Sequence, residues 1–194
     1  MYQFLTADCH FNHKNIIKYC KRPFKDTETM NNKMIYNINQ RCMKGDVLFH
    51  LGDFKFSKSA QADIIHKDPE LLLNPKIIHI KGNHDKNNNI KGMLDFGFIT
   101  FANTRYLLCH VPPPAESIKY NIIEHMIPYV DCVLCGHVHE NWLYKMYEKH
   151  IMKNIIMDAI PVINVGVDVW NFRPVRIDEV HRLYQKIMKK KESV

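Results

Sequence analysis

Aspartate, asparagine and histidine residues follow the ends of five apolar runs in this sequence. Their carboxylate, amide and imidazole groups are side chains that bind divalent first-row metal ions. Because residues two apart lie on the same side of an extended chain, Asp8 and His10 can both face one ion. The groups that follow the runs are Asp8-Cys9-His10, Gly52-Asp53, Lys81-Gly82-Asn83-His84-Asp85, His110 and Gly136-His137-Val138-His139.

Seven of these residues are candidate metal ligands. A single histidine after a strand is more often structural than a ligand, but seven such residues in equivalent positions are hard to explain by chance. Seven ligands are too many for one ion, whereas two ions about 4 Å apart that share one carboxylate would use them and would clamp a phosphoryl oxygen. A closed structural zinc site is not expected, because the cysteines form no cluster. The seven are Asp8, His10, Asp53, Asn83, His110, His137 and His139.

Hydrophobic periodicity places these residues at the carboxyl ends of strands in an α/β fold, where such folds bind ligands. The late strands predict a second sheet stacked on the first, and neither repeats nor linkers divide the chain, so one domain is expected over 1–194. The predicted strands are 1–7, 47–51, 77–80, 105–109, 132–135 and a strand-rich region at 142–167 with a turn at 148–154. The predicted helices lie around 16–19, 30–42, 59–68, 118–126 and 180–188, with a short buried piece at 71–73.

The composition is that of a globular protein, with 194 residues, 46% hydrophobic and 24% charged. No apolar run approaches the roughly 20 residues of a membrane-spanning helix, so a membrane protein is not expected. The six cysteines have no secretory start before them and are expected to be buried thiols in a reducing, cytoplasmic compartment. The net charge of +7 suits an anionic partner, although part of it lies in the tail Lys186–Lys191, where a solvated helix end is the simpler explanation.

The ordered blocks D-x-H, G-D, G-N-H-D/E, H and G-H-x-H resemble the calcineurin-like metallophosphoesterases. All five blocks occur here in that order, and the similarity covers most of the chain. Within that family, the sequence is similar to the small single-domain phosphoesterases of bacteria and phages. Further shared segments are Asp8-Cys9-His10-Phe11-Asn12-His13, Arg22-Pro23-Phe24, His50-Leu51-Gly52-Asp53-Phe54 and Asn164-Val165-Gly166-Val167-Asp168-Val169-Trp170.

The resemblance implies a four-layer αββα sandwich of two mixed β-sheets flanked by helices, and a role for each residue of the site. His84 would not bind metal but would donate a proton to the leaving oxygen, Asp85 would orient it, and a metal-bridging hydroxide would attack phosphorus. From the residues alone, Asp85 could instead serve only as a helix cap. Manganese is expected, with iron, zinc, nickel or cobalt as alternatives. The implied ligands are Asp8, His10 and His139 for the first ion, Asn83, His110 and His137 for the second, and Asp53 as the bridge.

The second block departs from that of the family's protein phosphatases. They continue it as G-D-x-x-D-R-G, whereas here Gly52-Asp53 is followed by Phe54-Lys55-Phe56-Ser57. The arginine that they use on substrate phosphate is therefore missing, and a phosphoprotein phosphatase is disfavoured. Lys81, Arg22 and His13 are the candidates for substrate contacts instead. A solvent-facing or structural role remains open for the first two, and a helix-start role for His13.

We expect a dimetal phosphoesterase that acts as a phosphodiesterase on nucleotides or nucleic acid, since the basic charge favours such substrates. A small-molecule phosphomonoesterase is the alternative. A non-catalytic scaffold would normally have lost ligands, and none is lost here. A metal-stabilised nucleic-acid module is suggested by Cys132 and Cys135, but residues three apart in a strand point to opposite faces and cannot readily share an ion.

Overall fold

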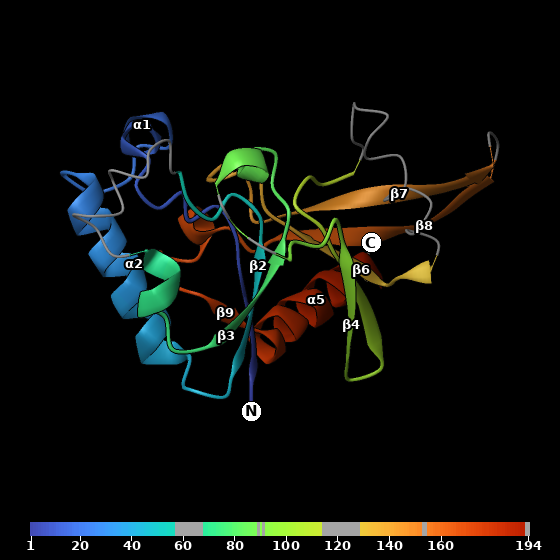
Figure 1. Ribbon diagram of the computed structural model, residues 1–194. Helices are drawn as coiled ribbons and strands as arrows, with labels where there is room; N and C mark the ends of the chain where they lie inside the picture. The colour runs from blue at the N-terminus through green and yellow to red at the C-terminus, as the bar shows by residue number, and fades with distance from the viewer. Residues whose placement is uncertain (57–67, 89, 91, 114–128, 153–154, 193–194) are drawn as a thin grey trace.

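The computed structural model describes residues 1–56, 68–88, 90, 92–113, 129–152 and 155–192, and at 87, 148–158 and 192 it describes the backbone only. Two β-sheets lie side by side with helices around them (Figure 1). This arrangement of two mixed sheets with flanking helices confirms the predicted α/β sandwich. The helices predicted at 59–68 and 118–126 fall almost wholly within 57–67 and 114–128, outside the described residues.

The first sheet has the strand order β3-β2-β1-β9. Strands β1, β2 and β3 run parallel, so their carboxyl ends meet at one edge. Strand β9 pairs antiparallel with β1 and was not predicted, because two residues carry no readable pattern. The bounds are β1 Gln3–Thr6, β2 Val47–Leu51, β3 Lys76–Ile80 and β9 Val175–Arg176.

The second sheet has the strand order β4-β5-β6-β8-β7. Strands β5, β6 and β8 run parallel, and the edge strands β4 and β7 are antiparallel to their neighbours. Strand β7 continues through two register shifts to Met152, so residues 148–152 are strand where a turn was predicted, and residues 153–154 lie outside the described residues. The bounds are β4 Gly97–Phe101, β5 Thr104–Leu108, β6 Cys132–Cys135, β7 Tyr144–Met152 and β8 Ile155–Asn164.

A hydrophobic core fills the space between the two sheets. Successive side chains of a strand point to opposite faces, so alternate residues enter this core. In β1, Leu5 faces the other sheet whereas Phe4 faces the helices. In β5, Tyr106 and Leu108 face the first sheet whereas Leu107 belongs to a cluster on the outer face. The packing of the two sheets thereby brings their carboxyl-terminal loops together.

Helices α1 and α2 cover the outer face of the first sheet (Figure 1). The side chain of Asp26 caps α2 by accepting a hydrogen bond from the backbone N–H of Thr29 at 2.8 Å. Met30, Met34 and Ile38 recur at helical spacing and are buried against the sheet, as predicted. The bounds are α1 Lys14–Tyr19 and α2 Thr27–Arg41.

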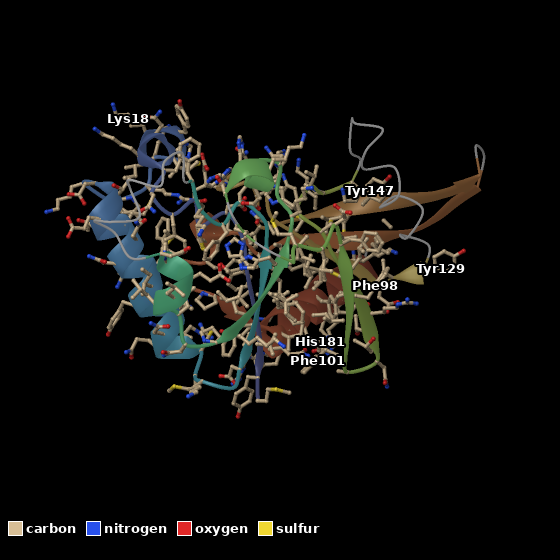
Figure 2. The ribbon with its side chains drawn as sticks, viewed as in Figure 1. Lys18, Phe98, Phe101, Tyr129, Tyr147 and His181 are labelled. Atoms are coloured by element: carbon tan, nitrogen blue, oxygen red, sulfur yellow. The ribbon has the colours of Figure 1, made fainter. Side chains whose placement is uncertain are left out.

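Helix α5 (Ile177–Glu192) packs Val180 and Ile187 onto the core between the sheets, which confirms the predicted terminal amphipathic helix. Its His181 lies against Phe101 of β4, with ring centroids 5.4 Å apart (Figure 2). Across the described ranges, no helix combines the length and apolar character needed to span a membrane.

Among the described residues, short 3-10 helices include η1 (Pro69–Leu72), η2 (Asp85–Asn87) and η5 (Val167–Val169). The prediction of a buried piece at 71–73 was wrong, because Leu71 is 82% exposed and Pro69 is the buried residue of η1.

Candidate metal centre

The predicted ligands converge where strands of both sheets end. Asp53, which follows β2, has its Oδ2 atom 3.3 Å from Nε2 of His110 and 3.5 Å from Nε2 of His10. Asn83, which follows β3, has its Oδ1 atom 2.8 Å from Nε2 of His110 and 3.0 Å from Nδ1 of His137. Side chains from five loops therefore aim their donor atoms at one place.

Asp8 and His139 complete this centre. The ligand atoms of Asp8, His10 and His139 all lie within 4.8 Å of one another, as do those of Asp8, Asp53 and His110. These two groups share Asp8 and lie side by side. Oδ2 of Asp53 is within 3.5 Å of a histidine from each group. Each group has residue types and distances that could hold a metal ion.

Five of the seven candidate ligands have a left-handed backbone, which residues other than glycine rarely adopt. Backbone hydrogen bonds between the loops hold this conformation: Asp8 N–H donates to the carbonyl of Gly52 at 3.0 Å, and His10 N–H to that of Asp53 at 2.9 Å. Backbone strain of this kind concentrates at functional sites. The φ angles are 57° for Asp8, 48° for His10, 57° for Asp53, 72° for His137 and 48° for His139.

Two glycines let the loops approach one another. A Cβ atom at Gly82 would collide with the backbone nitrogen and the carboxylate of Asp53. A Cβ atom at Gly136 would lie 2.7 Å from Oδ2 of Asp8 and 2.6 Å from the Cβ atom of Ala7. Both positions therefore require glycine for packing around the carboxylates.

The centre has a buried floor and an open mouth. Asp8, Asp53 and His110 are at most 2% exposed, whereas Asn83 and His137 are exposed at the mouth. Charged ligands on the floor are shielded from water, while the mouth leaves a route for a substrate.

Burial raises the pKa of Asp8 to about 6. Burial would lower the pKa of His110, but its hydrogen bond to Asp53 and the charges of Asp8 and Asp53 raise it to about 9. Burial would likewise raise the pKa of Asp53, but the hydrogen bond and charge of His110 and the charge of His10 hold it well below its usual range. Without a cation, a protonated imidazole compensates the carboxylates.

The residues present fit divalent cations. Nε2 of His10 is buried and has no hydrogen-bond partner among the described residues, and burial lowers the pKa of this imidazole to about 3. A neutral imidazole with an unused nitrogen is a typical metal ligand. Combined with carboxylate and amide oxygens, it makes a donor set suited to first-row divalent ions.

His84 lies beside the centre and belongs to none of the ligand groups found among the described residues. Its ring centroid is 5.8 Å from that of His10, and its side chain is exposed. Its backbone N–H donates to Oδ1 of Asp53 at 3.0 Å. The imidazole is thus placed next to the donor atoms, with its ring open to a bound ligand.

The prediction that Asp85 orients the His84 ring needs correction. The buried carboxylate of Asp85 accepts hydrogen bonds from the backbone N–H groups of Gly82 at 2.8 Å, Asp53 at 2.8 Å and Phe54 at 3.2 Å. Asp85 therefore ties the loop after β3 to the loop after β2. It positions the backbone that carries His84 rather than the ring itself.

The prediction that Arg22 contacts substrate was wrong. Its side chain is fully buried and pairs with Asp168 through two hydrogen bonds of 2.8 Å. The guanidinium also donates hydrogen bonds to the backbone carbonyl oxygens of Asp8 at 2.7 Å and Cys9 at 3.0 Å. A guanidinium engaged in this way supports the loop of Asp8 and has no route to a phosphate.

Two further residues of the site were missed in the sequence. Oδ2 of Asp168 is 3.1 Å from Nδ1 of His139, and Asn164 donates from Nδ2 to the backbone carbonyl of His139 at 2.8 Å. Burial would lower the pKa of His139, but the hydrogen bond with Asp168 raises it to about 10. The available signal was the shared segment 164–170, whose residues suggested no chemistry by themselves.

Lys81 and His13 remain predicted substrate contacts. Lys81 leaves β3 next to Gly82 with a half-buried side chain. His13 is the N-cap residue of α1 but makes no side-chain capping bond, and its ring centroid is 5.4 Å from that of His10. The predicted position of His13 at the start of a helix is confirmed, but its ring does not cap that helix.

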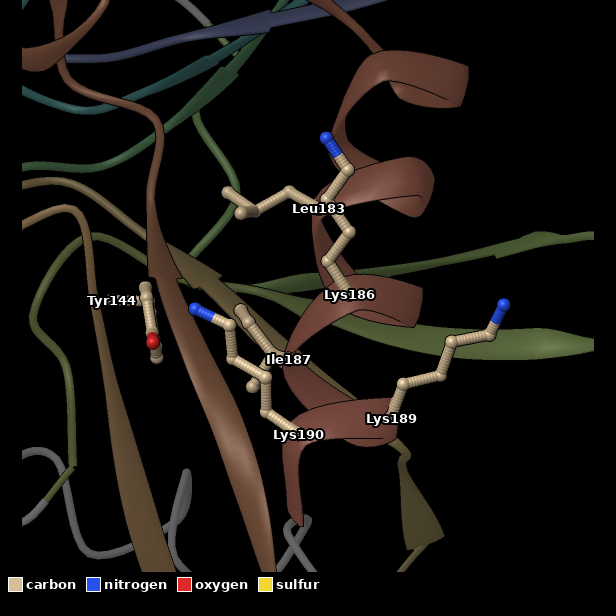
Figure 3. Close-up of a pocket in the computed structure, with 6 residues that line it drawn as sticks. All are labelled: Tyr144, Leu183, Lys186, Ile187, Lys189 and Lys190. Atoms are coloured by element: carbon tan, nitrogen blue, oxygen red, sulfur yellow. The ribbon is translucent and has the colours of Figure 1, made fainter. Parts of the chain in front are cut away.

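A separate hollow of about 290 Å³ lies between α5 and β7 (Figure 3). Leu183 and Ile187 of α5 and Tyr144 of β7 line it together with three lysines, of which Lys190 extends towards Tyr144. It shares no residue with the metal centre. The convergent donor atoms place the chemistry at the strand ends instead.

Comparison with known proteins gives the family of this chain. The calcineurin-like phosphoesterase superfamily domain matches residues 4–167. The uncharacterized protein MJ1445 of Methanocaldococcus jannaschii is 34% identical over 185 residues, which cover 94% of this chain and 91% of that protein.

Solved structures show the same fold. The crystal structure of AQ665, a protein of unknown function from Aquifex aeolicus, matches with a TM-score of 0.69 and 22% identity over 94% of this chain and 98% of that chain. With the family domain spanning 4–167, this chain belongs to the calcineurin-like phosphoesterase superfamily.

Proposed function

We propose that this protein is a dimetal-dependent phosphoester hydrolase that acts as a phosphodiesterase on nucleotides or nucleic acid. The observation that carries the proposal is the convergence of oxygen and nitrogen donors from both sheets beside one exposed imidazole, His84. The family assignment supports a metal-dependent phosphoesterase in general.

Asp8, His10 and His139 would hold one cation, Asn83, His110 and His137 the other, and Asp53 would contact both. Bound divalent cations would supply an activated water and neutralise charge on the phosphoryl group. Manganese is proposed because the set combines carboxylate, amide and imidazole donors, a mixture that iron, zinc, nickel or cobalt would also accept.

The chain's own residues would orient the ester and move the proton. His84 stands at the open mouth, where its imidazolium would donate a proton to the departing oxygen. Asp85 holds the loop of His84 against Asp53, which fixes the distance between proton donor and metal ligands. Lys81, which precedes Gly82 in the same loop, would attract the negatively charged phosphate of the substrate.

The net charge of the chain supports a polyanionic substrate such as nucleic acid, whose phosphates are diesters. The chain carries a net charge of +7, and a nucleic-acid substrate presents one phosphate per nucleotide. The arginine that the family's protein phosphatases carry after the aspartate that matches Asp53 is also missing, since Ser57 stands at its position, and this disfavours a phosphoprotein substrate.

The test compares purified protein with and without Mn²⁺ on bis(4-nitrophenyl) phosphate, 4-nitrophenyl phosphate, and cyclic and linear nucleotides, after a count of bound metal. We expect about two ions per chain and hydrolysis of diesters that stops in chelator. Faster hydrolysis of the monoester than of every diester would replace the diesterase proposal. Metal-independent rates, or no hydrolysis at all, would overturn the enzyme assignment.

A further inference from the structure

A row of rings leads from the metal centre towards helix α1. The His13 ring lies next to that of His10, with centroids 5.4 Å apart. His13 stacks on Phe56 at 4.6 Å with an interplanar angle of 26°. Tyr19, the last residue of α1, meets His13 edge-on at 6.4 Å. The row therefore extends from a candidate metal ligand to the molecular surface.

Hydrogen bonds fix the segments that carry this row. Phe11 N–H donates to the carbonyl of Phe54 at 2.9 Å, and Phe56 N–H donates to that of Phe11 at 2.8 Å. Asn31 of α2 donates from Nδ2 to Oδ1 of Asn12 at 2.6 Å. Because the rings are held before any ligand arrives, a ligand that stacks on them loses little free energy to ordering.

The outer end of the row is open to solvent. Tyr19 is 68% exposed, so its ring contributes little to the core, whereas His13 and Phe56 are partly buried beneath it. An exposed aromatic face beside partly buried rings suits the stacking of an unpaired base, which every nucleobase can provide.

The surface around Tyr19 is basic. Lys14 and Lys18 lie one turn apart on the same side of α1, Lys21 follows its end, and all three side chains are exposed. Figure 2 shows Lys18 on α1 at the periphery of the molecule. The segment 9–25 contains four lysines and one arginine but no acidic residue. The buried arginine, Arg22, is neutralised by Asp168, whereas the lysines face solvent.

We propose that His13, Tyr19, Phe56, Lys14, Lys18 and Lys21, here called the α1 rim, bind single-stranded nucleic acid and guide one of its phosphodiesters to the metal centre. The inference rests on the proposed function, because it names the substrate of that centre. A mononucleotide would place its phosphate at the metal centre, so no phosphate would remain for the lysines of the α1 rim. A polynucleotide supplies further phosphates to the lysines and unpaired bases to the rings.

The test measures binding apart from cleavage. Fluorescence anisotropy of a fluorescein-labelled oligothymidylate of about twelve nucleotides is recorded in chelator, where hydrolysis stops. Tyr19→Ala is expected to weaken binding about tenfold and Tyr19→Phe to restore it. Lys18→Gln is expected to reduce the slope of log K against log salt concentration by about 0.7.

Tyr36→Ala and Lys33→Gln are matched controls, because both residues are exposed on α2 and lie outside the α1 rim. The controls should bind like the wild type, and all variants should keep their melting temperature. Equal losses in Tyr36→Ala and Tyr19→Ala, or binding of a duplex as tight as that of the single strand, would overturn the inference.

Hydrolysis of bis(4-nitrophenyl) phosphate separates this inference from the proposed function. Mn²⁺-dependent hydrolysis without oligothymidylate binding would reject the α1 rim alone. Oligothymidylate binding that depends on Tyr19, without hydrolysis of any ester, would reject the proposed function and leave the α1 rim as a binding surface. In an active enzyme, Tyr19→Ala should lower kcat/KM for the oligonucleotide relative to that for the small ester by about tenfold.

Discussion

The backbone N–H of His84 donates to the carboxylate of Asp53, but the two side chains differ in exposure, and this difference separates their roles. His84→Ala removes an exposed imidazole that belongs to none of the described ligand groups. We expect the variant to keep its metal content and to lose at least about a hundredfold in turnover of a diester, the usual size of a general-acid contribution. Turnover equal to that of the wild type would remove His84 from the mechanism.

Asp53→Asn changes a carboxylate whose Oδ2 atom lies within 3.5 Å of both His10 and His110. The variant is expected to bind less metal and to lose activity, because a neutral amide compensates cationic charge less well. Metal analysis of the dialysed protein measures this, with His84→Ala as the comparison that retains its ions. Two ions per chain in Asp53→Asn would reject the bridging assignment.

At this scale, the sequence predicted which residues meet but not what every one of them contacts. The convergence of the seven candidate ligands could be predicted because each of them follows an apolar run. The roles of Asp85 and Arg22 could not be predicted in this way. Asp85 accepts hydrogen bonds from three backbone N–H groups, and Arg22 pairs with Asp168. Both sets of contacts depend on loops that are distant in sequence.

The ion pair of Arg22 with Asp168 joins the loop after α1 to η5, so it affects how these elements pack together. Arg22→Ala leaves the buried Asp168 carboxylate with His139 but without its guanidinium partner, and should lower the free energy of unfolding by about 3–5 kcal/mol. Arg173→Ala, an exposed residue just after η5, is the control and should change it by less than about 0.5 kcal/mol. Urea denaturation measures both variants. Full stability with a raised KM would restore the substrate-binding role of Arg22.

The loop after β3 depends on Gly82. Gly82→Ala would press a methyl group into Asp53, so the loops must separate and the variant should lose metal and melt at a lower temperature. Gly97→Ala in β4 is the matched control, because its new methyl group would meet no atom closer than 3.6 Å. Thermal denaturation and metal analysis compare the two variants. Equal melting temperatures and equal metal contents would show that the close approach of the loops at Gly82 is not required for stability or metal binding.

Elements were predictable in proportion to the strength of their pattern. The buried apolar runs were sufficient to predict β1, β2, β3 and β6, and the helical periodicity was sufficient to predict α2 and α5. Strand β4 was missed because Gly97–Phe101 alternates only weakly, with burial that is complete at Ile99 alone. The extension of β7 to Met152 includes two register shifts, which depend on pairing with β8 and which a linear pattern does not show.

For the whole molecule, metal binding and protonation are linked. The raised pKa values of His110, about 9, and His139, about 10, mean that both carry a proton at neutral pH when no cation is bound. A cation must displace such protons, so its affinity should rise by at least about tenfold per unit between about pH 6 and pH 8. Calorimetric titration with Mn²⁺ in buffers of different ionisation enthalpy measures the protons released. A pH-independent affinity would contradict this linkage.

The ion pair of Arg22 with Asp168 spans 146 positions of the chain, and its two ends support opposite sides of the same centre. During synthesis on the ribosome, the donors near the amino terminus emerge long before the segment that steadies His139. A nascent polypeptide therefore passes through lengths at which it exposes aspartates and histidines as an incomplete chelator. If the proposed ions bind, loading would consequently be a late event in the life of each new copy, after almost the entire domain has been translated.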